Sequence, residues 1–412
     1  MALKYLYVPS GYKAGTAYGV LPNDSSADFD EFSRATTATR TNKDGILESM
    51  GNNVPRLDYS DGGCPSLLLE PQRTNLVIYS EQISSWGKTP SDGTLIIRTD
   101  DETSPNGNMT ADVISVSTEL NGVFTQGITT VAESTYSCST YVKHVAGSSK
   151  IRVGITENFH SSTGSKYIVV DLSNGSIILN EVSSFATAKV INAGNGWYRV
   201  IIENITVPVG VGGNSHFVIY SYEDTFTEFS VWGGQIEVGN YTSSYIPNLS
   251  NGTTTRNNDA GNFAGNIDFN NSEGVFEAGF KAFPISIPSS RITLAADINN
   301  RITIGYSGGA NEPRPYLLIA SLSGGEDDIQ ISMPSSFNLF DYNTYKLKFQ
   351  SGNNELKING ELVDTDNSFK THTFSFDSAL KNISLNTQGT STERLFYGGI
   401  RHIKVYDSIT DF

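Results

Sequence analysis

The sequence predicts an all-β protein, with an extended N-terminal segment followed by two β-sandwich (jelly-roll) domains. From about residue 94 onward, runs of four to eight Val, Ile, Thr, Tyr and Phe residues alternate with Gly, Asn, Ser and Asp clusters, as in sandwiches. No stretch beyond about ten residues places apolar residues at helical spacing, so any helices should be short connectors. Aromatic residues make up 11% of the 412 residues, enough apolar side chains for more than one core.

The first segment, residues 1–79, has few runs that resemble strands. It contains three prolines, Pro55, Pro65 and Pro71, which disfavour helices and central strands. Its apolar residues are scattered among turn formers, too few in any one place to offset the entropy of ordering the backbone. We therefore expect this segment to be extended and to borrow burial from the adjoining sandwich, from identical chains or from another protein.

Two dense β regions follow the first segment. Residues 80–247 alternate strongly, residues 248–266 form an Asn-rich polar connection that reads as a linker, and residues 267–412 have the length of one further sandwich. Within the last region, Tyr345 to Leu362 predicts hairpin strands, and Asn359-Gly360 is a type I′ turn pair. Each region should fold around its own core.

Charge and cysteine content exclude several classes of protein. The net charge is −15 and the sequence pI is near 4.8, so nucleic acid would be repelled and is not expected as a partner. Neither an uninterrupted apolar stretch of the signal-peptide type nor a membrane span is visible, so we expect synthesis in a cytoplasm and no membrane partner. Cys64 and Cys138 are 74 residues apart in dissimilar surroundings and are expected to be free thiols.

Common catalytic signatures are missing from the sequence. There is no Gly-x-Ser-x-Gly, His-Glu-x-x-His, Cys-x-x-Cys or phosphate-binding loop, and the five histidines are dispersed. We expect no catalytic residue and no cofactor. Glu326, Asp327 and Asp328 place three carboxylates in an expected loop and are a weak candidate for a cation site. A solvated acidic loop is the preferred interpretation, because the spacing is not that of a known calcium loop.

Residues 32–81 carry a specific set of motifs. They are Arg-Ala-Thr-Thr-Ala-Thr at 34–39, Asp-Gly at 44–45, Asn-Val-Pro-Arg-Leu-Asp-Tyr at 53–59 and Glu-Pro-Gln-Arg-Thr-Asn at 70–75. In this order they resemble a segment that recurs in virion fibre and spike proteins of tailed bacteriophages. The resemblance implies attachment to the particle through residues 1–79 and a homo-oligomer, with a trimer as the first guess and a dimer as the second. The residues that carry the motif are Arg56, Asp58, Glu70, Arg73 and Asn75. The charged ones can pair with one another or with a neighbouring chain.

The second segment resembles the carbohydrate-binding-module-like sandwich that follows this strip in such phage proteins. The matching runs are SSWGK (84–88), TYSCSTYVKH (135–144), GNGWYRVIIE (194–203) and VWGGQIEVGNYTSSYIP (231–247). Trp197 and Trp232 lie in strand-like runs and are expected to be core anchors rather than sugar platforms. Gln235 and Glu237 share one face, and a structural hydrogen bond is preferred over a ligand contact. Trp86 remains a weak ligand-binding candidate.

The third segment resembles a concanavalin-A-like, laminin-G-like jelly roll. Residues 343–364 match the hairpin of that fold and residues 397–412 its closing strand. Taken together, the resemblances imply a structural head or tail fibre protein on the outside of a phage virion. Its partners would be capsid or tail proteins at the N-terminal segment and glycans of the host surface or the environment at the sandwiches.

Two alternatives stay open. The first is a fibre-borne polysaccharide depolymerase, which would need a pair of catalytic carboxylates that the sequence does not single out. The second is a bacterial surface adhesin that binds glycans, which would need a secretion route and an anchor. The preferred hypothesis is a non-enzymatic fibre protein, because it reconciles extracellular-type domains with an N-terminus that lacks a visible export signal.

Overall fold

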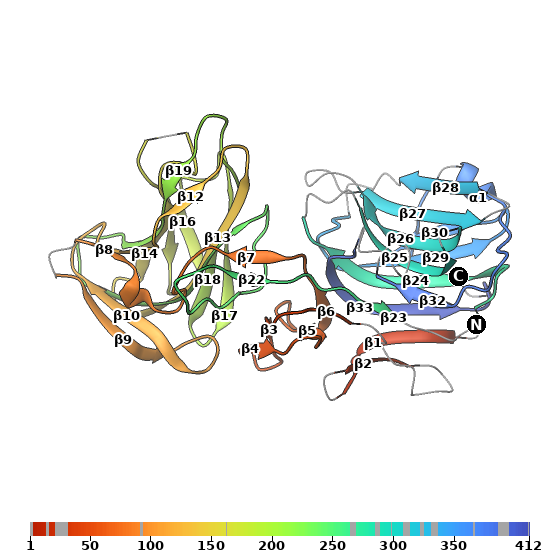
Figure 1. Ribbon diagram of the computed structural model, residues 1–412, viewed down its shortest axis with the longest axis horizontal. Coiled ribbons are helices and arrows are strands. Elements are labelled where there is room, and N and C mark those ends of the chain that lie inside the picture. Colours follow the sequence, from red (N-terminus) through yellow and green to blue (C-terminus); the bar gives the residue numbers. More distant parts are fainter. Residues whose placement is uncertain are drawn as a thin grey trace. The chain divides into compact units, whose positions relative to one another are not determined.

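The structure is a computed structural model of the chain (Figure 1). It describes residues 3–13, 16–20, 32–90, 94–161, 163–263, 269–284, 289–297, 299–307, 314–321, 325–330, 337–365, 367–385, 395–410 and 412.

The chain is nearly all β, which confirms the predicted fold class. Among the described residues, helical structure is limited to the 3-10 turn η1 (Ile83–Ser85) and the single short helix α1 (Asn367–Thr371). The chain divides into two compact units. We call residues 38–49 with 72–256 the central sandwich, and residues 1–37, 50–71 and 257–412 the C-terminal sandwich.

Two six-stranded antiparallel sheets build the central sandwich. The first has the order β17-β18-β13-β21-β10-β9, with β9 (Ile96–Thr103), β10 (Met109–Val116), β13 (Thr135–Gly147), β17 (Thr187–Gly194), β18 (Trp197–Thr206) and β21 (Thr227–Val238). The second has the order β16-β15-β14-β20-β11-β8, with β8 (Gly87–Thr89), β11 (Gly122–Phe124), β14 (Lys150–Ile155), β15 (Lys166–Asp171), β16 (Ser176–Asn180) and β20 (Phe217–Ser221). Both sheets send alternate apolar side chains into one core, including Ile114 and Ile202 from the first and Ile151 and Ile219 from the second.

Three short strand pairs complete the central sandwich. They are β3 (Ala38–Thr41) with β4 (Leu47–Met50), β7 (Arg73–Asn75) with β22 (Thr254–Arg256), and β12 (Ile128–Thr130) with β19 (Gly213–Ser215). Through β3, β4 and β7, pieces of the N-terminal segment become part of this unit. Cys138 is buried in its core, whereas Cys64 of the other unit is exposed, and both thiols are free.

The C-terminal sandwich also has two sheets. The larger contains β2-β1-β33-β24-β29-β30-β31, with β6 pairing to β33 and β5 to β6; its strands are β1 (Leu3–Lys13), β2 (Thr16–Val20), β5 (Arg56–Asp58), β6 (Ser66–Leu69), β24 (Glu273–Ala282), β29 (Asn343–Gln350), β30 (Glu355–Ile358), β31 (Glu361–Leu362) and β33 (Gly398–Tyr406). The smaller has the order β23-β32-β25-β26-β27-β28, with β23 (Asn262–Phe263), β25 (Ser289–Asp297), β26 (Asn300–Ser307), β27 (Arg314–Ser321), β28 (Gly325–Gln330) and β32 (Asn382–Ser384). Their facing side chains form one apolar core.

The predicted hairpin strands lie in the larger sheet. β29 and β30 pair with Leu347 opposite Leu356, and β30 continues into β31 through Asn359-Gly360. Asn359 and Gly360 have φ angles of 51° and 87°, the left-handed pair that a type I′ turn requires. The turn therefore has a purely conformational explanation.

Part of the N-terminal segment, which was expected to be extended and to borrow burial, forms strands in the larger sheet of the C-terminal sandwich. β1 pairs with β33, and Tyr5 and Tyr7 are 2% and 0% exposed in the core of the C-terminal sandwich. β5 and β6 add to the same sheet beside β33. Short strands of scattered apolar residues are stable here because they borrow burial from the sandwich, one of the three sources that the composition left open.

Residues 248–266 were expected to form a linker, and the described part of this range is instead built into the fold. Asn248 is fully buried, and its side-chain amide donates to the carbonyl oxygens of Val77 at 2.8 Å and Gly252 at 2.6 Å. β22 pairs with β7. The polar composition misled the prediction because these side chains satisfy buried backbone groups rather than solvate a free connection.

Candidate functional site

Residues of the N-terminal motif meet in a buried network of ion pairs in the C-terminal sandwich. The Asp259 carboxylate receives the guanidinium of Arg34 at 3.0 Å on one oxygen and that of Arg56 on the other. Arg56 also binds Glu70 at 2.8 Å, and the backbone N–H of Glu70 donates to Asp259 at 2.8 Å. The four side chains are 0–3% exposed. The network thus ties three separate stretches of sequence together without contact with solvent.

Arg56 is held in its charged form within this network. Burial opposes the charge of Arg56, but the adjacent carboxylates of Asp259 and Glu70 outweigh it and raise the pKa of the guanidinium above its ordinary value. Arg34 makes further bonds to the carbonyl oxygens of Thr36 and Gly51 at 2.9 and 2.7 Å. A set of groups so closely saturated by one another is suited to holding the fold and offers no proton or lone pair to a substrate.

Two other motif residues lie apart from this network, in the central sandwich. The Arg73 guanidinium is 3.8 Å from the Glu237 carboxylate, and its central carbon is 5.2 Å from the centre of the Tyr241 ring. The Asn75 amide donates to the carbonyl oxygens of Gly234 and Ile246 at 3.0 and 2.9 Å. These contacts hold β7 beside β21, so the two side chains have a structural role.

Asp58 has a local role. Its carboxylate accepts hydrogen bonds from the backbone N–H of Ser60 at 3.0 Å and from the hydroxyl of the same residue, which closes the turn after β5. These contacts place the Asp58 carboxylate in the turn that follows β5.

Gln235 and Glu237 form a buried polar pair on the face of β21 opposite to that of the core residue Ile236. Both are fully buried, and the Gln235 amide donates to Glu237 at 3.0 Å. Glu237 also accepts from the backbone N–H and the hydroxyl of Ser243 at 2.6 and 2.7 Å, while Gln235 accepts from the N–H of Ile246 at 2.7 Å. Burial raises the pKa of Glu237 above its ordinary value, although Arg73 and Ser243 oppose this. The contacts match the structural interpretation of this pair.

The three tryptophans are all core residues. Trp197 and Trp232 are each 1% exposed, as expected for anchors, and Trp232 packs against Tyr245 with ring centres 4.8 Å apart. Trp86, the candidate for ligand binding, is only 3% exposed, and its indole N–H donates to the Tyr79 carbonyl at 3.2 Å. The ligand hypothesis for Trp86 needs an exposed ring and is therefore wrong, because this ring is buried in the core of the central sandwich.

The acidic candidate Glu326, Asp327 and Asp328 is placed in a strand and not in the expected loop. These residues belong to β28, which pairs with β27 at the edge of the smaller sheet of the C-terminal sandwich, and their side chains lie outside the described residues. Across the described part of the chain, no three His, Cys, Asp or Glu side chains gather as a metal-ligand set.

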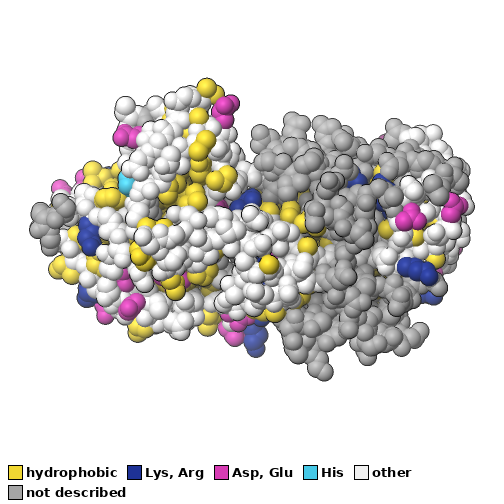
Figure 2. All heavy atoms as spheres, in the orientation of Figure 1, with side chains coloured by type: hydrophobic (Ala, Val, Ile, Leu, Met, Phe, Trp, Pro, Cys, Tyr) yellow, Lys and Arg dark blue, Asp and Glu magenta, His cyan; other side chains and the backbone are white. Residues whose placement is uncertain are grey.

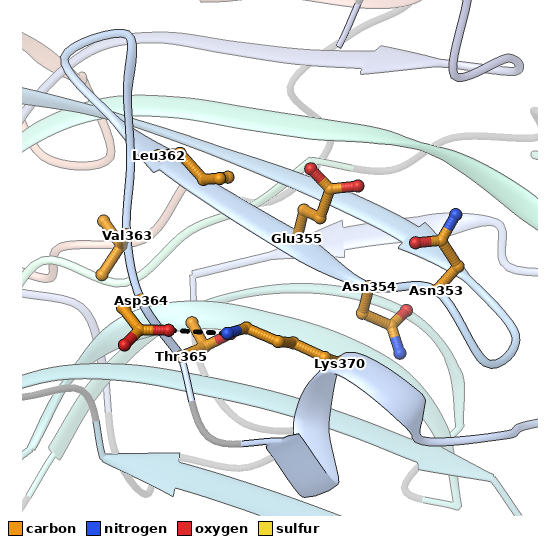
Figure 3. A pocket seen from close by; sticks show the side chains of 8 residues that line it. All are labelled: Asn353, Asn354, Glu355, Leu362, Val363, Asp364, Thr365 and Lys370. Atoms are coloured by element: carbon orange, nitrogen blue, oxygen red, sulfur yellow. Dashed lines mark hydrogen bonds and ion pairs between the residues drawn. The ribbon is translucent and has the colours of Figure 1, made fainter.

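A pocket of about 370 Å³ opens on the C-terminal sandwich beside α1 (Figure 3). Its lining residues are Asn353, Asn354, Glu355, Leu362, Val363, Asp364, Thr365 and Lys370. Lys370 spans its floor to reach Asp364 at 2.6 Å, and Asn354 donates to the backbone carbonyls of Phe369 and His372 at 3.0 and 3.1 Å. The side chains of Asn354, Asp364 and Lys370 are thus paired within the protein, whereas the buried hydroxyl of Thr365 has no hydrogen-bond partner among the described residues.

The open outer face of the second sheet of the central sandwich was not singled out from the sequence. Phe124, Tyr167 and Tyr220 line it, and each is partly exposed. The pairing of Asp259 with both Arg34 and Arg56 was also missed, although Arg34 lies inside a run that carries the resemblance. Only the strand register, which alternation does not specify, could have paired these residues.

The chain has no detectable match to a protein-family profile or to a curated protein. Among solved structures, it is similar to domains LG4-5 of the mouse laminin α1 chain, at 11% sequence identity and a TM-score of 0.24, covering 68% of this chain and 85% of that one. No helix in the described residues is long and apolar enough to span a membrane.

Proposed function

We propose that this chain is a structural fibre protein of a tailed-phage virion, attached to the particle head or tail by its N-terminal segment and adhering to glycans through its sandwiches. The observation that carries the proposal is that residues of the motif resembling phage fibres are buried in a network of ion pairs. Buried ion pairs join Arg56 to Glu70 and Asp259, and they fix the N-terminal segment to the C-terminal sandwich. We call these three residues the clamp. A fibre needs such a clamp, because the segment that holds the particle must transmit load to the domains that it displays.

The proposal includes the absence of enzymatic activity. The ionisable groups with the greatest burial, in the Arg56 network and around Glu237, are saturated by hydrogen bonds and carry structural roles. A depolymerase would need two carboxylates about 5 to 10 Å apart facing a substrate cleft. The pocket beside α1 contains two acids, Glu355 and Asp364, and these pair with Lys348 and Lys370.

The proposed location is tested by purifying particles from a lysate of cells in which the gene is expressed. Density-gradient fractions are analysed by protein mass spectrometry with a major capsid protein as the reference. We expect the chain to band with the particles at a fixed ratio to the capsid protein and to resist a wash in high salt. A chain found only in the soluble fraction would rule out the fibre assignment and favour the adhesin.

A further inference from the structure

The outer face of the second sheet of the central sandwich carries aromatic rings in an ordered arrangement. Three residues, each on a different strand pair, stand directly opposite a glycine: Phe124 opposite Gly87, Tyr220 opposite Gly122 and Tyr167 opposite Gly154. We call these six residues the aromatic face.

Because glycine has no side chain, each ring can pack directly against the backbone of the glycine opposite it. A Cβ atom added to Gly87 would lie 2.2 Å from the Phe124 ring, one added to Gly154 would lie 2.5 Å from the Tyr167 ring, and one added to Gly122 would lie 2.9 Å from the Tyr220 ring. Each ring therefore occupies the space above the glycine opposite it. Tyr220 is fixed further by a side-chain hydrogen bond with Thr89.

The rings cover the sheet but are not themselves covered. Val169 and Val218 point to the same face and are 0% and 1% exposed, so the neighbouring side chains shield them from water. The rings of Phe124, Tyr167 and Tyr220 stay partly exposed. On the other sheet of this sandwich, Trp197 and Trp232 are buried completely with Tyr245, which the segment at Thr39 holds by a hydrogen bond. The aromatic side chains on the outer face of one sheet are therefore buried, whereas those on the outer face of the other sheet are partly exposed.

The charges beside the aromatic face are balanced locally. The Arg152 guanidinium lies 4.8 Å from the Tyr222 ring centre and 5.9 Å from that of Tyr167, and it pairs with Glu119 at 2.5 Å. Lys150 pairs with Glu223 at 2.7 Å. Figure 2 shows basic and acidic side chains of the central sandwich scattered among uncharged ones in that view. With a net charge of −15 on the whole chain, an anionic ligand would be repelled and an uncharged one would not.

We propose that the aromatic face is a binding site for an uncharged polysaccharide. The C–H groups on one side of a sugar ring are weakly positive and stack on the negative side of an aromatic ring. Tyr167 and Tyr220, with ring centres 6.2 Å apart and planes inclined by 50°, would receive two parts of one twisted glycan chain, and Arg152 would donate hydrogen bonds to its hydroxyl groups. The site deepens the proposed function and rests on its claim that the sandwiches adhere to glycans.

A structural explanation makes a different prediction. Aromatic rings over glycines also stabilise strand pairing in sheets, so removal of the rings would lower stability without any effect on binding. The experiment must therefore measure binding and folding in the same variants.

The full chain is tested by affinity electrophoresis in gels that contain soluble neutral polysaccharides, namely a glucan, a mannan and a galactomannan, with acidic alginate as the comparison. The test variant is the double change Tyr167→Ala and Tyr220→Ala. The conservative variant is Tyr167→Phe, which keeps the ring. The matched control is Tyr198→Ala, which removes a ring that lies over Gly175 outside the aromatic face. Circular dichroism and thermal melting report on the fold of each variant.

We expect retardation by at least one neutral polysaccharide, little change between low and high salt, and about a tenfold loss of affinity in the double variant. Tyr167→Phe and Tyr198→Ala should bind nearly as the parent does. If the double variant melts at a lower temperature but is retarded as before, the aromatic face is structural only.

Three other results would overturn the proposal. Salt-sensitive binding to alginate alone would assign the site to acidic glycans, and no retardation in any gel would remove it. A fall in molar mass by light scattering for the double variant, without a change in retardation, would assign the face to a second copy of the chain. None of these results bears on the banding of the chain with particles, so the proposed location and this site stand or fall separately.

Discussion

At the scale of single residues, the buried charges have the clearest physical consequences. Arg56 holds two carboxylates that are almost completely removed from water, those of Asp259 and Glu70. Removal of one partner of a buried ion pair leaves the other charge without compensation, which costs far more than the loss of an exposed pair. The motif residues therefore matter to stability in proportion to their burial.

We predict that Arg56→Leu lowers the free energy of unfolding of the C-terminal sandwich by about 3–5 kcal/mol, because it removes the buried guanidinium that binds both Asp259 and Glu70. Urea titration of the full chain measures this loss. The matched control is Lys370→Leu, whose ion pair with the exposed Asp364 should contribute about 1 kcal/mol or less. Equal stabilities of Arg56→Leu and the parent would show that the network is not needed for folding.

Glu277 on β24 gives a prediction of pH dependence. Burial works against its ionisation, but His402 at 3.1 Å and Lys404 at 2.6 Å outweigh this and lower the pKa of the carboxyl from 4.5 to about 2. A lowered folded-state pKa adds stability that is present above pH 4.5 and is lost as the pH falls towards 2.

Glu277→Gln should therefore destabilise the C-terminal sandwich at pH 7 and differ little from the parent near pH 2. Urea unfolding at a series of pH values measures the difference between the two curves. Glu361→Gln, at an exposed position of β31, serves as the control and should follow the parent at every pH. Parallel curves for the parent and Glu277→Gln would contradict the assigned ion pairs.

At the scale of elements, local sequence patterns predict strands and turns, but they do not predict which strand β1 pairs with. The alternating strands and the Asn359-Gly360 turn follow from local patterns and were predicted, whereas for α1 the sequence predicted only that any helix would be short. The place of β1 beside β33, 400 residues away in sequence, depends on long-range pairing that periodicity does not encode. For the same reason, the Arg56 pairs could be expected only as alternatives, and the glycines beneath the aromatic rings could not be anticipated.

β1 also revises what a shortened chain should do. The sequence predicted that residues 267–412 fold around a core of their own, but Tyr7 is fully buried in the C-terminal core. We expect Tyr7→Ala to lower the stability of the C-terminal sandwich by about 3–5 kcal/mol, as for other large aromatic residues in cores, and to leave the central sandwich unchanged. Calorimetry should show one of two transitions shifting. Lys4→Ala on the same strand is the control, and an unchanged thermogram for Tyr7→Ala would place β1 outside the folded core.

At the scale of the whole molecule, the structure joins two sandwiches with separate apolar cores, and stretches of the N-terminal segment are shared between them. The central claim is that such a chain adheres to glycans and does not cut them. Its most direct test is to incubate the purified full chain with surface polysaccharide from the host cells and to measure, in the same samples, the bound fraction and the release of reducing ends. We predict saturable binding with no release above the blank. Reproducible turnover that a single Asp or Glu substitution abolishes would contradict the account and identify a depolymerase.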